Sequence, residues 1–421
     1  MDAHLYPSIC HGKINIPPSK SMAHRAIIAA SLANGTSTIS NIAYSQDILA
    51  TIDCMQALGA TILKQENTLT ITGISSFQDI KKTTIFCNES GSTLRFLIPL
   101  FSLCKQPIIF TGSKRLLQRP LTLYKDIFQK QQCSFIQDED HIEIKQALHA
   151  DTFTIPGNVS SQFITGLLFT LPLLEEDSII KILPPFESSS YVDLTIQMLE
   201  NYSIQIEKQD DLTFFIKGKQ QYQPCDYRVE GDFSQFAFFA VLAAISNTLT
   251  IQGVNPKSKQ GDKEILNILT AFGTKIEELP FGYIVHKSDL HAQDIDLANC
   301  PDLGPILCIL AMYSQGNTHI YNAGRLRIKE SDRIAAMEEE LSKFGLNIHS
   351  TQNDIYISPS PSYTCKEILY GHNDHRIVMA LSVASLCGWQ ETLIHDAQAI
   401  NKSYPNFFED LASIHGKVEY Q

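Results

Sequence analysis

The chain has 421 residues, 44% of them hydrophobic and 19% charged, and its 45 acidic residues outnumber its 33 Lys and Arg residues for a formal charge of −12. A chain of this length exceeds what one hydrophobic core accommodates, so we expect about two domains. The negative charge argues against a protein that binds nucleic acid or acidic membrane surfaces broadly, because those partners favour a basic surface.

The first twenty residues contain neither a basic start nor the apolar run of a signal peptide, and no apolar run approaches the roughly 20 residues that a membrane helix needs. A cytoplasmic protein is therefore expected. The ten cysteines form no CxxC pair, and the two closest, Cys300 and Cys308, are eight residues apart. This spacing favours reduced, buried thiols over a disulfide framework or a zinc site, with Cys300 in the core rather than a nucleophile.

Six similar stretches follow one another along the chain. Each opens with a polar cluster, continues with ten to twelve mostly apolar residues, breaks at a polar or Gly/Asn turn and ends in a short strand-like run. The clusters recur every 70 to 72 residues, near Lys20, Ser90, Ser161, Asp232, Asp302 and Asp374. Six repeats of about 70 residues thus account for the whole chain.

Each apolar run is long enough for a helix and apolar nearly all round, which predicts a helix in the centre of a domain. After the strand, several repeats show i, i+3, i+4 apolar spacing that ends at Gly or Asn, and this pattern predicts a second, more polar helix. It is clear in residues 45–60, 191–202, 261–274 and 331–345. The predicted fold class is α/β, with two domains each built from three β-α-β-α-β-β repeats.

The first turn of each central helix presents free backbone N–H groups and a positive dipole end, which favour anions. If the central helices of a domain run parallel, these ends converge on one face. Polar residues recur about 27 to 30 positions after each cluster and are expected on the same face: Asp47, Arg119, Ser188 with Tyr191, Asp262, Lys329 with Glu330, and Lys402.

The cations at these positions exceed what a single phosphate needs. They are Lys20, Arg25, Arg95, Arg119, Lys329, Arg333, His375, Arg376 and Lys402. Arg binds carboxylates and phosphates with two parallel hydrogen bonds and Lys acts as a point charge, so the set suits ligands with several anionic groups. Asp302 and Glu330, among these cations, are candidates for proton transfer.

Each motif has a simpler explanation when taken alone. SKSMAHR (Ser19–Arg25), ESGSTLR (Glu89–Arg95) and SSQF (Ser160–Phe163) could be ordinary helix caps, NDHR (Asn373–Arg376) a structural histidine beside a surface arginine, and RLRIKESDR (Arg325–Arg333) a solvated helix start rich in charge pairs. Independent surface charges have no reason to keep the phase of a 70-residue repeat. Their common phase favours one ligand site.

The motifs PPSKSMAHR, LRIKESDRI and NDHRIVMA occur in that order, and together with NKSYPNFFEDL near the C-terminus they resemble the enolpyruvyl transferase family across the whole chain. Within the family, the resemblance is to the branch whose acceptor is shikimate 3-phosphate. It implies an inside-out α/β barrel fold in two domains that close around the substrates. One domain would span residues 14–229, on the shikimate 3-phosphate side, and the other residues 1–13 with 230–421, on the phosphoenolpyruvate and acid/base side, with the active site in the cleft between them.

The resemblance implies that the enolpyruvyl group of phosphoenolpyruvate is transferred to the 5-hydroxyl of shikimate 3-phosphate, with release of phosphate and without a metal or organic cofactor. It implies a monomer whose partners are these two small molecules. The residues implied for shikimate 3-phosphate are Lys20, Ser21, Arg25, Ser160, Ser161, Gln162, Ser188, Tyr191, Asp302 and Lys329. Those implied for phosphoenolpyruvate are Lys20, Gly91 through its backbone, Arg119, Gln162, Arg333, His375, Arg376 and Lys402.

We assign the catalytic roles as a hypothesis: Asp302 accepts the hydroxyl proton, Glu330 moves the proton at C3 of phosphoenolpyruvate, and Lys20 assists the departing phosphate. The chain departs from the common family pattern at Glu89, Phe96, Ser190 and Arg325. Two alternatives stay open. One is the sister branch that uses UDP-N-acetylglucosamine, whose loop cysteine has no counterpart near Arg119, and the other is a catalytically inactive anion-binding scaffold on the same repeat.

Overall fold

The computed structural model describes residues 1–420. The chain divides into two compact units: a split unit, Met1–Pro17 together with the chain from Glu230 on, and a continuous unit, Pro18–Val229. Each has its own hydrophobic core. The expected domain boundary needs a correction, because residues 14–17 belong to the split unit. Strand β2 (Gly12–Asn15) pairs there with β15 (Leu249–Gln252), and the Pro17 carbonyl accepts a hydrogen bond from the Asp232 amide.

All six sheets have the same four-stranded pattern. A parallel pair is extended by two antiparallel strands, and in five of the six sheets the outer antiparallel pair is a hairpin of consecutive strands. In the continuous unit the sheets are β14 (Tyr227–Arg228), β3 (Thr36–Ser40), β5 (Thr68–Thr72), β4 (Thr61–Gln65); β6 (Thr84–Phe86), β7 (Ile108–Thr111), β9 (Ile142–Lys145), β8 (Ser134–Gln137); and β10 (Thr152–Pro156), β11 (Ser178–Leu183), β13 (Thr213–Ile216), β12 (Ile206–Lys208).

The split unit repeats this arrangement three times. Its sheets are β2, β15, β17 (Gly282–Val285), β16 (Ile276–Leu279); β18 (Ile295–Asp296), β19 (Thr318–Tyr321), β21 (Ile355–Ser358), β20 (Asn347–Ser350); and β22 (Leu369–Tyr370), β23 (Thr392–His395), β1 (Ala3–Tyr6), β24 (Lys417–Tyr420). Most strands alternate buried and less buried residues, so each sheet covers the core with one face.

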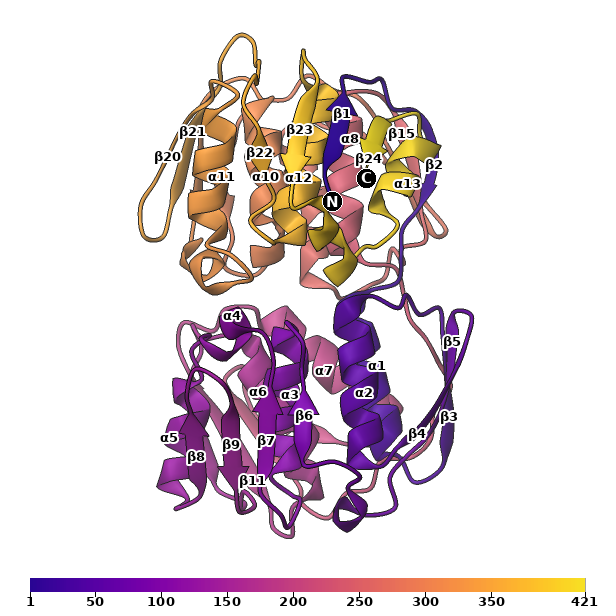
Figure 1. Ribbon diagram of the computed structural model, residues 1–421, viewed down its shortest axis with the longest axis vertical. Coiled ribbons are helices and arrows are strands. Elements are labelled where there is room, and N and C mark those ends of the chain that lie inside the picture. The colour runs from indigo at the N-terminus through magenta and orange to yellow at the C-terminus, as the bar shows by residue number, and fades with distance from the viewer. Residues whose placement is uncertain (421) are drawn as a thin grey trace. The chain divides into compact units, whose positions relative to one another are not determined.

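Three repeats take one strand from a distant part of the sequence. β14 completes the first repeat, β2 the fourth and β1 the sixth. Figure 1 shows the indigo strand β1 between the yellow strands β23 and β24, where Ala3 pairs with Ile394 on one side and Tyr420 on the other. These three repeats are therefore not complete within their own 70 residues, because each needs a strand from elsewhere in the chain.

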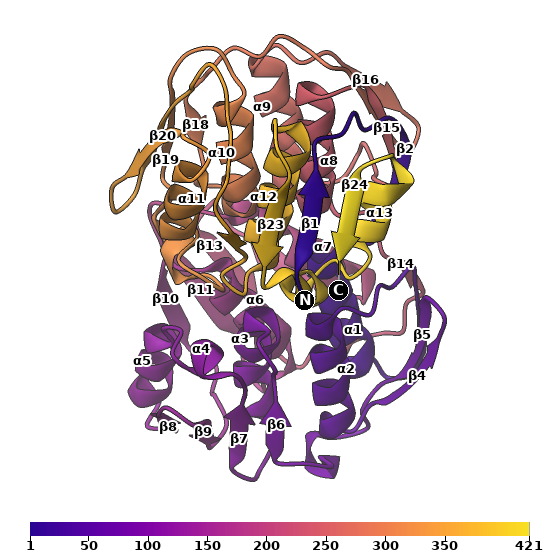
Figure 2. The ribbon, with the colours of Figure 1, turned by 45° about the horizontal axis from the view of Figure 1, so that its top comes forward.

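The apolar runs form the six central helices. They are α1 (Lys20–Leu32), α3 (Gly91–Phe101) and α6 (Ser161–Thr170) in the continuous unit, and α8 (Phe233–Ile245), α10 (Gly304–Met312) and α12 (His375–Cys387) in the split unit. In the split unit α8, α10 and α12 pack on one another, as Figure 2 shows. Nearly every residue of these helices is buried, which explains why their sequences lack a polar face.

The remaining helices are more polar on one side. They are α2 (Gln46–Leu58), α4 (Lys114–Leu117), α5 (Thr122–Lys130), α7 (Ser189–Asn201), α9 (Ile265–Ala271), α11 (Arg333–Ser342) and α13 (Phe407–Ser413). Short 3₁₀ turns connect elements at η1 (Phe77–Asp79), η2 (Leu171–Leu173), η3 (Gly261–Glu264), η4 (Pro301–Leu303), η5 (Gly324–Ile328) and η6 (Ala397–Lys402). Between residues 1 and 420 no helix is both long and apolar enough to span a membrane.

Candidate functional site

The first turns of the three central helices of the split unit meet at one guanidinium group. Arg376, the second residue of α12, donates from Nη2 to the Ser234 hydroxyl of α8 at 3.0 Å and from Nη1 to the Asp302 carbonyl in η4, just before α10, at 3.1 Å. The predicted convergence of helix N-termini is therefore confirmed within this unit. Asp302 lies inside a 3₁₀ turn that starts at Pro301 and leads into α10, so it is not the cap of that helix.

The Asp302 carboxylate is shared by three cations. Its oxygens lie 3.1 Å from Lys329 Nζ, 3.1 Å from Arg333 Nη1 and 3.2 Å from Arg376 Nη2. Burial opposes ionisation of this group, but the three cations hold its pKa well below the usual value of 3.8. The side chain is still 21% exposed. Asp302 is thus an ionised carboxylate that a ligand can reach from solvent.

Arg333 is the centre of the same cluster and is almost completely buried. Its guanidinium contacts Asp302, Glu330 Oε2 at 2.8 Å and, through Nε, Asp374 Oδ2 at 2.8 Å. Burial disfavours its charge, but these three carboxylates together raise its pKa above the ordinary value. The arginine therefore fixes both candidate proton-transfer groups, Asp302 and Glu330, relative to each other.

Lys402 and His375 lie beside this cluster in the split unit. Lys402, the last residue of η6, donates to the Asn373 carbonyl at 2.6 Å, and its side chain is largely buried. His375 is the first residue of α12 and is buried, with Nδ1 3.9 Å from Asp374 Oδ1. The seven predicted site residues of the split unit therefore lie on the two stretches that lead into α11 and α12 and in two 3₁₀ turns, η4 and η6.

In the continuous unit, Gly91 and Arg119 lie side by side, as expected for a shared ligand. A Cβ atom at position 91 would come within 2.5 Å of Arg119 Nη1, so a larger residue there would displace the guanidinium from its place against the first turn of α3. Gln162 of α6 links to the same helix by accepting from Arg95 Nη1 at 2.8 Å and donating to Ser92 Oγ at 2.9 Å. The N-termini of α3 and α6 thus meet, with Ser161 in the first turn of α6 and Ser160 as its cap.

The residues expected to bind shikimate 3-phosphate connect α1 to α7. Arg25 donates to the Ser21 carbonyl at 2.8 Å, the Tyr191 carbonyl at 3.0 Å and the Thr195 hydroxyl at 2.9 Å. Burial lowers the pKa of this guanidinium to about 10. Ser188 caps α7 in a left-handed conformation, φ 54°, which non-glycine residues rarely adopt.

Lys20 at the start of α1 forms an ion pair with Asp47 of α2 at 2.8 Å. The side chains are 17% and 9% exposed, so the pair is only partly open to solvent. Asp47 thus holds the ammonium group at the helix N-terminus.

The caps of the central helices differ between the units. Ser19, Ser90 and Ser160 cap α1, α3 and α6 with neutral hydroxyls, and no acidic residue occupies the first turn of these helices. In the split unit Asp232 and Asp374 cap α8 and α12, so carboxylates already occupy those N-termini. The N-termini of the central helices of the continuous unit therefore carry no capping carboxylate, whereas in the split unit Asp374 caps α12 and also binds Arg333.

A buried chain of hydrogen bonds ties three helices of the continuous unit together. His24 Nδ1 lies 2.7 Å from the Thr51 hydroxyl, which lies 2.7 Å from the Thr93 hydroxyl, and Thr93 donates to Ser90 Oγ at 2.7 Å. Burial, together with Lys20 and Arg25, lowers the pKa of His24 well below its usual value, so the ring is neutral. The chain fixes the cap of α3, and with it Gly91, relative to α1 and α2.

Sequence reasoning missed some of the residues that hold this site in place. The sequence marks Asp374 as the start of the sixth recurring cluster but assigns it no role, yet its fully buried carboxylate binds Arg333 and caps α12. An aspartate directly before an apolar helix is a cap signal that could have identified it. Ser234, which binds Arg376, carries no comparable signal, because a serine in a first turn is common.

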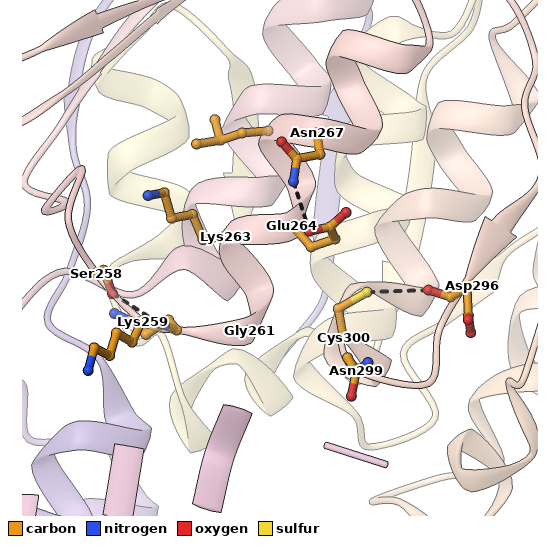
Figure 3. A pocket seen from close by; sticks show the side chains of 11 residues that line it. Ser258, Lys259, Gly261, Lys263, Glu264, Asn267, Asp296, Asn299 and Cys300 are labelled. Carbon is orange, nitrogen blue, oxygen red and sulfur yellow. Dashed lines mark hydrogen bonds between the residues drawn. The ribbon is translucent and has the colours of Figure 1, made fainter. Parts of the chain in front are cut away.

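The cavity shown in Figure 3 lies in the split unit but contains none of the predicted site residues. It has a volume of about 670 Å³ and is lined by Lys259, Lys263, Glu264, Asp296 and Cys300, among others. Burial raises the pKa of the Cys300 thiol, and Asp262, Glu264 and Asp296 raise it further. The thiol therefore stays protonated, which agrees with a core residue rather than a nucleophile.

The fold and these residues define a two-unit α/β protein in which repeated helix N-termini gather arginine, lysine and carboxylate groups. The family profile described as EPSP synthase (3-phosphoshikimate 1-carboxyvinyltransferase) matches residues 7–411. The chain belongs to the EPSP synthase family.

Individual relatives agree with this membership. The chain is 43% identical over 413 residues to the 3-phosphoshikimate 1-carboxyvinyltransferase of Clostridium perfringens, covering 97% of each chain, and 42% identical to that of Clostridioides difficile, covering 99% of this chain and 98% of the relative. Among solved structures, the EPSP synthase of Acinetobacter baumannii superposes with a TM-score of 0.81 at 22% identity over the full length of both chains. The enolpyruvyl transferase NikO of Streptomyces tendae superposes with a TM-score of 0.80 at 14% identity, covering 99% of this chain and 98% of that one. The two structures support the fold.

Proposed function

We propose that this protein transfers the enolpyruvyl group of phosphoenolpyruvate to the 5-hydroxyl of shikimate 3-phosphate and releases phosphate. It would act as a 3-phosphoshikimate 1-carboxyvinyltransferase in the shikimate pathway of aromatic amino acid biosynthesis. Family membership supports the reaction. The observation that carries the proposal is the pair of carboxylates, Asp302 and Glu330, bound to the same buried Arg333.

The chemistry requires two proton-transfer groups. The 5-hydroxyl of shikimate 3-phosphate must lose a proton while it attacks C2 of phosphoenolpyruvate, and C3 must gain one. The tetrahedral adduct then loses phosphate and a C3 proton, which restores the double bond. Asp302 serves the hydroxyl and Glu330 serves C3, because each is an acid or base held by Arg333 within the cation cluster.

The low pKa of Asp302 fits a base only if its surroundings change when ligands bind. Arg376, Lys329 and Arg333 hold that pKa down in the ligand-free protein. A bound carboxylate or phosphate competes for the same cations, which weakens their pull on Asp302 and makes it a stronger base. Ligand binding thus prepares the carboxylate for the proton that it accepts.

We assign groups of both units to the two anionic substrates. Ser160, Ser161, Gln162, Ser188, Tyr191, Ser21 and Arg25 bind shikimate 3-phosphate, whose phosphate suits the neutral-capped helix ends. Gly91 and Arg119 bind phosphoenolpyruvate together with Arg333, His375, Arg376 and Lys402 of the split unit. Lys20 contacts both ligands and stabilises the leaving phosphate, and Lys329 completes the acceptor site beside Asp302.

The direct test is phosphate release from the purified protein. With shikimate 3-phosphate and phosphoenolpyruvate both present and no metal added, we expect continuous release of inorganic phosphate, and none when either substrate is omitted. Release with UDP-N-acetylglucosamine in place of shikimate 3-phosphate would assign the sister activity. Binding without release would identify an anion-binding scaffold and reject the proposal.

Arg119→Ala tests the division of ligand contacts. Because Arg119 lies against Gly91 in the continuous unit, we expect its loss to raise KM for phosphoenolpyruvate at least tenfold, on the order expected for a charge-assisted contact, with a much smaller change for shikimate 3-phosphate. The control is Arg115→Ala, which removes an exposed arginine of α4. Equal effects on both KM values would show that the division is wrong.

We further propose that the protein works as a cytoplasmic monomer. Its negative net charge supports this, and so does the fact that all strands of its six sheets come from the chain itself. Light scattering during size-exclusion chromatography should give a mass near 47.1 kDa. A mass of twice that value at assay concentrations would contradict it.

A further inference from the structure

Glu340 is a buried carboxylate outside the site described above. Both of its oxygens accept hydrogen bonds from neighbouring groups. It lies on α11 and is fully inaccessible to solvent. Lys343 Nζ lies 2.9 and 2.8 Å from its two oxygens, His372 Nε2 lies 2.9 Å from Oε1, and the Tyr370 amide donates to Oε2 at 3.0 Å. Two of these donors, from Tyr370 and His372, belong to the segment that leads into α12.

That segment has a backbone that needs outside support. His372 and Asn373 both have left-handed conformations, with φ of 50° and 51°, which non-glycine residues rarely adopt, least of all in succession. The Asn373 carbonyl then accepts from Lys402, and Asp374 binds Arg333 and caps α12. A shift of this segment would move the Lys402 and Arg376 groups that grip the ligand.

Helix α11 holds the segment at two points. Arg333 at its start binds Asp374, and Glu340 binds His372. These two helix residues are seven positions apart, so they lie on one face two turns apart. Because α11 is rigid, the spacing between Arg333 and Glu340 determines the backbone path of residues 370–374.

We propose that Glu340, acting through His372 and the Tyr370 amide, is a positioning residue that fixes the phosphoenolpyruvate-binding segment ahead of α12. The inference rests on the proposed function, because it assigns the segment to that ligand. Glu339, Glu340 and His372 also have the spacing of a metal-binding group. However, the ammonium group of Lys343 already contacts both Glu340 oxygens, so the carboxylate has its cation without a metal.

The cluster has a defined pH dependence. The groups that face the His372 ring are Glu340, Glu339 and Lys343, and the hydrogen bond that the Glu340 carboxylate accepts from the ring raises the pKa of His372 above its usual 6.5. Burial opposes ionisation of Glu340, but His372 and Lys343 lower its pKa. The charged contact is therefore complete below about pH 6.5 and weakens as pH rises through the raised pKa of His372.

The test uses His372→Ala and His372→Gln in the full chain, with Glu339→Gln as the matched control on the neighbouring exposed carboxylate. We expect His372→Ala to raise KM for phosphoenolpyruvate roughly tenfold, while kcat and KM for shikimate 3-phosphate change less than about threefold. His372→Gln keeps a neutral donor to Glu340 at every pH. Its KM for phosphoenolpyruvate should therefore lie between those of the wild type and His372→Ala, and it should lack the rise in KM with pH that we expect of the wild type. Glu340→Gln should also raise KM for phosphoenolpyruvate, as His372→Ala does.

Several outcomes would overturn the inference. Thermal destabilisation of these variants with an unchanged KM for phosphoenolpyruvate would mean a purely structural role. Tight binding of one added Zn²⁺ per chain, lost in His372→Ala, would mean a metal site. If the wild type releases no phosphate, the proposed function itself is rejected. If the wild type turns over normally and the variants have the same KM for phosphoenolpyruvate, only this positioning role is rejected.

Discussion

Replacing Asp302 by Ala is expected to lower kcat at least about 10²-fold, the range of a positioned acid or base, with only a modest rise in KM for shikimate 3-phosphate. The variant loses the carboxylate that accepts the hydroxyl proton, and it leaves Lys329, Arg333 and Arg376 without their shared anion. The extra positive charge should support anion binding even as chemistry slows. Steady-state phosphate release measured at saturating substrates separates the two effects.

Glu330→Ala should produce a loss of kcat of similar size for a different reason. Glu330 is held by Arg333 Nη2 at 2.8 Å and is assigned to the proton at C3. In deuterated water, the incorporation of deuterium at C3 should fall together with turnover. The control for both variants is Asp289→Asn, an exposed carboxylate of the same unit. Near-normal turnover in either variant would refute the role given to that residue.

Arg333→Ala should destabilise the split unit by about 3–5 kcal/mol, because it leaves buried carboxylates without their counter-ion. Arg333 is 1% exposed, and Asp374, which it binds, is fully buried. Lys275→Ala, which breaks an exposed pair with Glu277, should cost less than about 1 kcal/mol. Hydrogen exchange of residues 333–342 and 375–387 in increasing urea gives the local free energy of unfolding for each variant.

The destabilisation should depend on pH with a fixed sign. Burial opposes ionisation of Asp374, but Arg333 lowers its pKa below 3.8, and Asp302 is shifted the same way. Such carboxylates add stability above their unfolded pKa and lose it as pH falls through the lowered folded pKa. The difference between wild type and Arg333→Ala should therefore be largest near pH 7 and shrink in acid. If the difference in free energy of unfolding between wild type and Arg333→Ala were the same at pH 7 and in acid, the arginine would act through packing alone.

The sequence predicted the central helices well, because their apolar runs and polar openings repeat at a constant spacing. It also predicted that charged residues gather there, since Arg376 and Asp302 lie at those openings and Arg333 lies in the second recurring cluster of its repeat. It could not place the pairing of short strands. Nothing in the sequence of residues 12–17 says that they pair with β15 rather than begin the continuous unit, since strand pairing is a long-range contact without a local signal.

The supporting residues were harder to predict than the ligand-binding ones. Glu340 looks like one more surface carboxylate in the run Glu338–Glu340, and only the fold shows that it alone of the three is fully buried, against Tyr370 and His372. The chain His24–Thr51–Thr93 likewise joins residues from three helices and two repeats. Such partners become visible only when the helices are packed.

The position of β1 between β23 and β24 also affects how the protein emerges from the ribosome. Residues 3–6 are synthesised before their partners at 392–395 and 417–420, and nearly 390 residues separate them in the chain. At roughly 5–20 residues per second, the first strand waits on the order of 20–80 s for the edge that it joins. The continuous unit lies wholly between these points and can fold during that interval, so the split unit is completed last, and its carboxylate and arginine cluster with it.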